Sequence, residues 1–208
     1  MFNALIRGVA TVTLMASFTL PVRAENITLT DTLDRTVEIP EDPQRILLGF
    51  YYEDFLAVAG PDAYERVVAI SKDTWAGWRN LQWQTYAAAI PRLEQLADVG
   101  EVDAGTFSLE AVVAAKPDLA IFAAWQYRAL GGVADRIEAA GIPVVVLDYN
   151  AQTVEKHVQS TQLFGQIMGK QERAELLSSE YTAQISAIEE RLAALPIGDA
   201  PKVYVELA

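Results

Sequence analysis

The longest helical pattern in the sequence runs from Gln171 to Leu195 and contains neither glycine nor proline. Its apolar residues recur every three or four positions, so they fall on one face of a helix. At 1.5 Å per residue this helix would be roughly 37 Å long, about the width of a small domain. A helix of that length can pack against one lobe and reach a second. The apolar face consists of Ala174, Leu177, Tyr181, Ile185, Ile188, Leu192 and Leu195.

The segment after this helix predicts a turn followed by a strand. Two prolines, Pro196 and Pro201, bracket the turn, and residues 202–207 read Lys-Val-Tyr-Val-Glu-Leu. Alternating apolar and polar residues favour a β-strand. No partner for that strand follows in the chain. We therefore expect residues 196–208 to be the first strand of a second lobe that this chain does not supply.

Residues 25–170 alternate short apolar strands with helices, which favours an α/β fold with a mainly parallel sheet and flanking helices, one Rossmann-like lobe. The segment Ile142–Leu147 is continuously apolar, as is typical of a strand buried on both faces. A β-hairpin, Asn26–Thr30 with Arg35–Ile39, is expected at the start. Residues 72–84, rich in tryptophan, have a loop-like composition. The other expected strands and helices are Ile46–Gly49, Tyr52–Ala59, Val67–Ile70, Leu109–Ala115, Leu119–Ala123, Val133–Ala140 and Val154–Met168.

The first 24 residues have the pattern of a secretory signal peptide. Arg7 precedes an apolar run from Gly8 to Leu20, and a Val-Arg-Ala sequence ends the segment. Its removal would change the net charge from −12 to −14, because it contains Arg7 and Arg23 but no acid. This excess of acid argues against nucleic acid and anionic membranes as partners. The chain has no cysteine, so neither a disulfide nor a lipid anchor at the cleavage point is expected.

Catalytic motifs are scarce. The sequence has one histidine, no cysteine, no G-x-S-x-G elbow and no phosphate-binding loop. His157 lies within an amphipathic helix, and we interpret it as a solvated surface residue. One imidazole does not make a histidine-rich metal site, so neither a bound metal nor a cofactor is predicted.

Aromatic residues and two arginines follow three of the predicted strands. Ligands of α/β proteins bind beyond the carboxyl ends of strands, and aromatic rings with guanidinium groups suit a large, planar or aryl, anionic ligand. Trp83 is expected to be packing, whereas Trp78 and Arg79, beside Gly77, are expected to be exposed in a cleft. The candidate ligand-binding residues are Tyr51, Tyr52, Trp75, Trp78, Arg79, Trp125, Tyr127 and Arg128.

The chain resembles the substrate-binding proteins of ABC importers for iron complexes, haem and cobalamin. The resemblance rests on TDTLDRTVEIPEDPQRIL, VGEVDAGTFSLEAVVAAKPDLAIF, GIPVVVLDY and GKQERAELLSSEY, and it covers the sequence after residue 24. Two positions depart from the family pattern: Asp34 replaces a glycine, and the loop from Asp103 to Gly105 lacks the aromatic residue of cobalamin-binding members.

The resemblance implies two α/β lobes joined by one long helix, here 171–195, with a ferric siderophore as the expected ligand. It also implies delivery to an inner-membrane permease from the periplasm, without covalent chemistry. In that family the segment matching SLEAVVAAKPD carries the glutamate that docks on the permease, which is Glu110 here. Ser108 is a suitable cap for a helix whose first turn holds Glu110.

Two other functions are compatible with the sequence. The chain could be a periplasmic enzyme acting on a small metabolite, with Asp73, Glu101 or Asp103 as a general acid or base. It could also be a solitary lobe that serves as an interaction protein.

Overall fold

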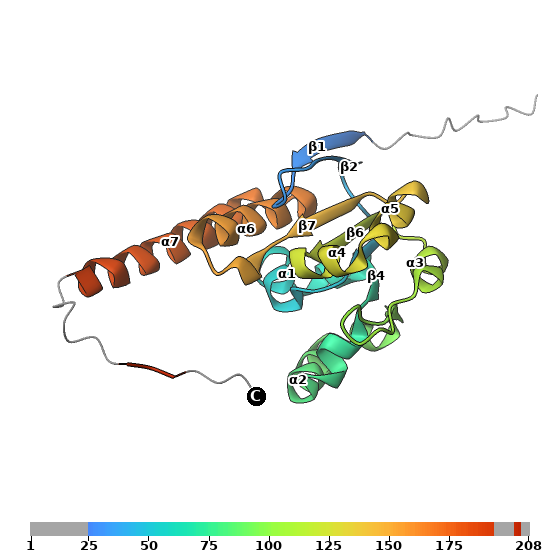
Figure 1. Cartoon of the computed structure of the whole chain (residues 1–208), viewed down its shortest axis with the longest axis horizontal. Coiled ribbons are helices and arrows are strands. Elements are labelled where there is room, and N and C mark those ends of the chain that lie inside the picture. The colour runs from blue at the N-terminus through green and yellow to red at the C-terminus, as the bar shows by residue number, and fades with distance from the viewer. Residues whose placement is uncertain (1–24, 194–201, 205–208) are drawn as a thin grey trace, which may run out of the picture.

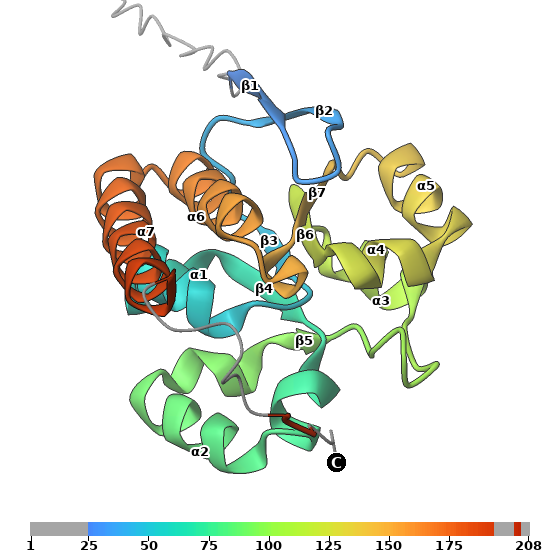
Figure 2. The same ribbon diagram turned by 60° about the vertical axis from the view of Figure 1, so that its left-hand side comes forward.

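A five-stranded parallel sheet forms the centre of the molecule, with the strand order β5-β4-β3-β6-β7 (Figures 1 and 2). The structure is a computed structural model that describes residues 25–193 and 202–204. It confirms the α/β fold with a mainly parallel sheet. The strands are β3 (Ile46–Leu48), β4 (Val67–Ile70), β5 (Ala97–Asp98), β6 (Leu119–Ala123) and β7 (Val144–Leu147).

Helices cover both faces of this sheet. Strand β6 shows how, because Ile121 and Ala123 belong to the apolar core on one face, whereas Ala120 and Phe122 belong to the core on the other. All five residues of β6 are buried, as its unbroken apolar sequence requires. The first face is covered by α1 (Tyr52–Ala59), α6 (Val154–Met168) and the start of α7 (Gln171–Ala193), and the second by α3 (Leu109–Ala115), α4 (Ala124–Leu130) and α5 (Gly132–Ala139).

The prediction of a loop at residues 72–84 is wrong, because most of this segment is helical. A π-helical turn, η2 (Asp73–Gly77), leads into α2 (Asn80–Ala89). Trp75 and Trp83 are buried and fix the two pieces to the core, and no proline interrupts them. Helix α4 and strand β5 were also not predicted. The remaining helical turns are η1 (Pro61–Arg66), η3 (Pro91–Gln95) and η4 (Tyr149–Ala151).

The predicted hairpin is present. It pairs β1 (Asn26–Thr30) with β2 (Thr36–Pro40) in antiparallel register. The turn contains Asp34 with φ 59°, a left-handed conformation that aspartate tolerates better than most residues. This conformation explains why a glycine position of the family can be occupied by Asp34.

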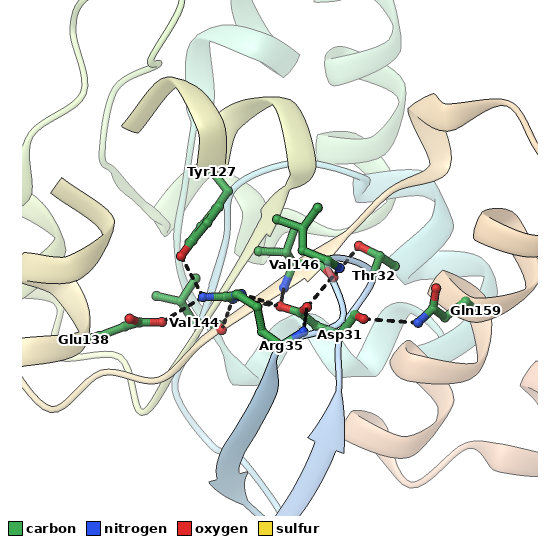
Figure 3. Close-up of polar contacts among 9 residues, drawn as sticks. Asp31, Thr32, Arg35, Tyr127, Glu138, Val144, Val146 and Gln159 are labelled. Atoms are coloured by element: carbon green, nitrogen blue, oxygen red, sulfur yellow. Dashed lines mark hydrogen bonds and ion pairs between the residues drawn. The ribbon is translucent and has the colours of Figure 1, made fainter. Parts of the chain in front are cut away.

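The turn of the hairpin is fixed to the edge strand β7 by Asp31, which is fully buried (Figure 3). The Asp31 carboxylate accepts hydrogen bonds from the backbone amides of Leu33, Arg35 and Val146. It also forms an ion pair of 2.7 Å with the Arg35 guanidinium. Thr32 adds two bonds to the Val146 carbonyl, donated by its amide and its hydroxyl.

Arg35 links the same turn to the helices behind it. Its guanidinium donates to the Tyr127 hydroxyl and to the Val144 carbonyl, both at 2.8 Å, and contacts Glu138 at 3.1 Å. It also lies over the Tyr127 ring, 4.2 Å from the centroid. We call the polar side chains of this region the hairpin anchor: Asp31, Thr32, Arg35, Tyr127, Glu138 and Gln159.

Helix α7 is buried at its start and exposed at its end. Ala174 is buried, whereas Ile188 and Leu192 are 50% and 59% exposed. The far end of α7 extends well beyond the sheet and its helices in Figure 1. Leu195 lies outside the described residues, as do the proposed signal peptide and most of the predicted last strand. Residues 202–204 of that strand have no strand pairing. None of the described helices is long and apolar enough to cross a membrane.

Candidate functional site

The carboxyl ends of the parallel strands meet at one edge of the sheet, and Phe50 lies at its centre. Phe50 follows β3, and its ring packs edge-on against Trp125, which follows β6, at 5.4 Å. Arg79, which follows η2 after β4, places its guanidinium 5.6 Å from the Phe50 ring centroid. Segments after three strands therefore converge on one aromatic ring. We call Phe50, Trp78, Arg79, Trp125 and Arg128 the carboxyl edge.

The two arginines of the carboxyl edge are weakly paired. Arg79 lies 3.8 Å from Glu53 and its side chain is 49% exposed, while Arg128 lies 3.9 Å from Asp148 and is 63% exposed. Long ion pairs in contact with water contribute little to stability. Both guanidinium groups can therefore bind an anion without breaking a strong contact.

Trp78 is exposed, as predicted, with 59% of its surface in contact with solvent. It follows the π-helical turn η2, a type of local widening that is common at functional sites. A large exposed aromatic side chain next to an arginine, here Arg79, is a common feature of binding surfaces.

Three of the candidate aromatic residues lie in the interior. Tyr52 is 1% exposed and stacks on Trp75, which is fully buried, with 4.5 Å between the ring centroids. Tyr51, 5% exposed, donates a hydrogen bond of 2.6 Å to Asn150, and burial raises the pKa of its hydroxyl. None of these rings presents a free face at the carboxyl edge. Trp83 is buried, as expected for packing.

Helix α4 separates Trp125 from Tyr127. Trp125 contacts Phe50 at the carboxyl edge, whereas Tyr127 accepts the hydrogen bond of Arg35 in the hairpin anchor. The two residues are two positions apart and therefore about 200° apart around the helix. The structure does not bring Tyr127 together with the other candidates.

Glu101, considered above as a catalytic base, is fully buried near the carboxyl ends of the strands. It accepts hydrogen bonds from the Val102 amide and from the Gln126 side chain, and burial raises its pKa. Gln126 also bonds to Gly49 and Ala123, so the pair holds β3 and β6 in place. These contacts indicate a structural role for Glu101.

Asp73 and Asp103 are exposed. The charge of Asp103 adds to burial in raising the pKa of Glu101, so these two acids are neighbours. The described residues contain no group of histidine, cysteine and acidic side chains that could hold a metal ion.

Glu110 lies in the first turn of α3 and is exposed, as expected. Ser108 caps the helix by accepting a hydrogen bond of 3.1 Å from the Ala111 amide, and its hydroxyl donates to Glu110 at 3.3 Å. The carboxylate is therefore oriented outward at a helix N-terminus. Its role in docking stays a prediction.

The prediction that His157 is a solvated surface residue is wrong. The imidazole is half-buried and stacks on Tyr181 of α7 with 3.8 Å between ring centroids, and its edge meets Tyr149 at 4.9 Å. Burial lowers its pKa. The contact joins α6 to α7, and a single histidine within a helix gives no indication of it in the sequence.

Comparison with known proteins identifies the family. The model of a family described as "Periplasmic binding protein" matches residues 56–208, which is more than half of the chain. No significant match was found among curated proteins.

Solved structures agree with the family match. A TroA-like periplasmic binding protein, FepB from Veillonella parvula, is 27% identical with a TM-score of 0.77, over 85% of this chain and 51% of that one. The molybdate-binding protein MolA of Haemophilus influenzae is 19% identical, with a TM-score of 0.61 over 83% and 55%. The siderophore-binding protein BauB, solved with two acinetobactin molecules and ferric iron, is 21% identical, with a TM-score of 0.58 over 83% and 56%. The chain thus spans about half the length of these structures.

Proposed function

This chain belongs to the periplasmic binding protein family, and we propose that it is the solute-binding component of an ABC importer for a ferric siderophore. The protein would capture the chelate in the periplasm and deliver it to a permease in the inner membrane. Export would depend on residues 1–24 acting as a signal peptide. The related structures are described as binding proteins, which favours capture over catalysis.

The carboxyl edge is the observation that carries this proposal. It combines the exposed ring of Trp78 and the partly buried rings of Phe50 and Trp125 with the guanidinium groups of Arg79 and Arg128. Aromatic rings offer flat apolar contact, and guanidinium groups bind carboxylate or catecholate oxygens in a fork. A large anionic chelate can pack against the aromatic rings and accept hydrogen bonds from the guanidinium groups. In this arrangement Tyr51, Tyr52 and Trp75 support the site from within the lobe, whereas Tyr127 belongs to the hairpin anchor.

Helix α7 supports a two-lobed arrangement. It leaves the lobe of residues 25–170 on the side of the carboxyl edge, and its exposed end reaches past the sheet (Figure 1). We propose that residues 171–195 form the connection between lobes and that residues 196–208 begin the second lobe. A chelate held between the lobes would be enclosed on both sides.

Tryptophan fluorescence tests the ligand, because Trp78 and Trp125 lie at the carboxyl edge and two other tryptophans are buried. Ferric siderophore should quench the emission saturably, and the iron-free siderophore, molybdate, haem and cobalamin should compete weakly. Replacing Trp78 by leucine should remove part of the quenching. Saturable binding of haem or molybdate in preference to every ferric chelate tried would contradict the proposed ligand.

Delivery to the permease is proposed to use Glu110, and charge reversal tests it. Glu110→Arg should leave chelate binding unchanged but stop uptake, because like charges would then face each other at the contact. Glu155→Arg is the matched control, since Glu155 occupies the same position after its cap, Thr153, and is also exposed. Uptake at the normal rate by the Glu110 variant would exclude the docking role.

A further inference from the structure

A hollow of about 250 Å³ lies where α7 leaves the body, between α1, α6 and α7. It is separate from the carboxyl edge, because none of the residues of that edge lines it. Its volume is below that of sites for drug-sized ligands and suits a molecule of a few heavy atoms. The lining side chains include Asp54, Tyr149, His157, Thr161, Glu180 and Tyr181.

The charge of the hollow is negative. Asp54 from α1 and Glu180 from α7 contribute carboxylates, and no lysine or arginine is among its lining residues. In the described part of the chain, neither acid forms an ion pair with a basic side chain. Glu180 is exposed, whereas Asp54 is partly buried. A partly buried carboxylate without an ion-pair partner is unfavourable, and a bound cation would relieve it at Asp54.

Burial is the main reason that the pKa of Asp54 is raised to about 6, and the neighbouring Glu53 adds to the shift. Arg79 acts in the opposite direction but does not overcome these effects. His157, whose pKa is lowered by burial, is neutral at pH 7 and adds no positive charge. The other titratable groups facing this region are Tyr51, Tyr149, Tyr181 and Glu180.

The walls of the hollow are aromatic. Tyr149 and Tyr181 flank the imidazole of His157, and each of the two tyrosine rings contacts it. Carboxylates together with aromatic faces bind ammonium groups, since the ring quadrupole and the carboxylate both attract a cation. A metal ion is a poor alternative, because the described residues offer no suitable group of ligands.

We propose that the hollow between α1, α6 and α7 binds a small organic cation that carries an ammonium group. Asp54 and Glu180 would accept its charge, and Tyr149 and Tyr181 would contact its carbon atoms. Because the hollow lies between the lobe and α7, the bound cation would tie the helix to the lobe. This site does not depend on the ferric chelate, so either proposal can fail without the other.

The single histidine of the sequence provides the test. In NMR spectra of the purified protein, the ring signals of His157 should shift saturably as propylammonium chloride is added at pH 7.5. Sodium chloride at the same ionic strength should not reproduce the shift. The affinity should fall as the pH drops through about 6, because Asp54 then takes up a proton.

Variants decide whether the two carboxylates form the site. Asp54→Asn and Glu180→Gln should each weaken propylammonium binding by about tenfold, the loss of one charge-assisted contact. Asp62→Asn, an exposed acid outside the hollow, should leave binding unchanged. The proposal is overturned if propylammonium gives no saturable shift, or if binding survives unchanged in Asp54→Asn.

Discussion

The hairpin anchor and the carboxyl edge use the same residue types but differ in how completely those residues are paired. In the anchor, Arg35 is 25% exposed and forms a 2.7 Å ion pair with a fully buried acid. At the edge, Arg79 and Arg128 are 49% and 63% exposed, and their nearest acids are 3.8 and 3.9 Å away. An arginine whose donors are all occupied holds the fold together, and one with free donors is available to a ligand.

The buried acids show the same contrast. Asp31 accepts backbone and guanidinium hydrogen bonds on both carboxylate oxygens. Asp54 forms no ion pair with a described basic residue, and burial raises its pKa. Whether a charged side chain is paired therefore distinguishes structural from functional residues better than its residue type does.

Arg35→Ala should lower the free energy of unfolding by about 3–5 kcal/mol, because it leaves the Asp31 carboxylate buried without its partner. Urea unfolding measures the loss. Arg66→Ala is the control, since Arg66 pairs at the same 2.7 Å with Asp42, an acid that is 67% exposed, and should cost less than about 1 kcal/mol. Equal losses of unfolding free energy in the two variants would show that the buried ion pair of the anchor stabilises the protein no more than an exposed one.

Asp54→Asn should act in the opposite direction and stabilise the protein at pH 7 by about 1–3 kcal/mol. The folded-state pKa of about 6 exceeds the unfolded value of about 3.9, so the native state binds more protons between these limits. Stability should therefore fall as the pH rises from 4 to 6 and then level off, and the variant should lack this fall. Asp62→Asn is the control, and its stability should fall over this interval as that of the wild type does. If the stability of both proteins instead rises from pH 4 to 6, Asp54 is not an unpaired acid.

Arg79→Ala and Arg128→Ala should each weaken binding of the ferric chelate by about tenfold, the value of one charge-assisted hydrogen bond. The free energy of unfolding should change by no more than about 0.5 kcal/mol, because the ion pairs being lost are long and exposed. Fluorescence titration and urea unfolding provide the two measurements. Arg136→Ala, an exposed arginine on α5, should change neither. A large loss of stability in Arg79→Ala would make that residue structural.

Hydrophobic periodicity was sufficient to predict most of the fold. Helices α1, α3 and α6 and strands β4 and β6 lie at the bounds expected from apolar spacing and from breakers such as Pro117 and Gly169. Periodicity failed at residues 72–84, where the tryptophans obscured the helical pattern. It also failed where a short helix follows a strand directly, as α4 follows β6.

The site was harder to predict because it depends on side-chain direction. Phe50, Tyr51 and Tyr52 are adjacent, but Tyr51 has a left-handed φ of 60° and turns inward to Asn150, so Phe50 remains at the edge. A run of three aromatic residues does not reveal which one is exposed. The hollow beside α7 was missed for a related reason, since its residues come from α1, η4, α6 and α7, which meet only in the folded chain.

Tyr127 and Trp125 lie on different sides of α4 and should affect different properties. Tyr127→Phe removes the hydroxyl that accepts from Arg35 but keeps the ring beneath the guanidinium, so it should cost about 0.5–1.5 kcal/mol of stability. Affinity for the ferric chelate should not change, because Tyr127 faces the hairpin anchor. Trp125→Phe, two positions away, should leave stability nearly unchanged and weaken chelate binding through lost contact with the ligand. If Tyr127→Phe weakens binding while stability is unaffected, Tyr127 belongs to the ligand site after all, and the anchor and the edge share a residue.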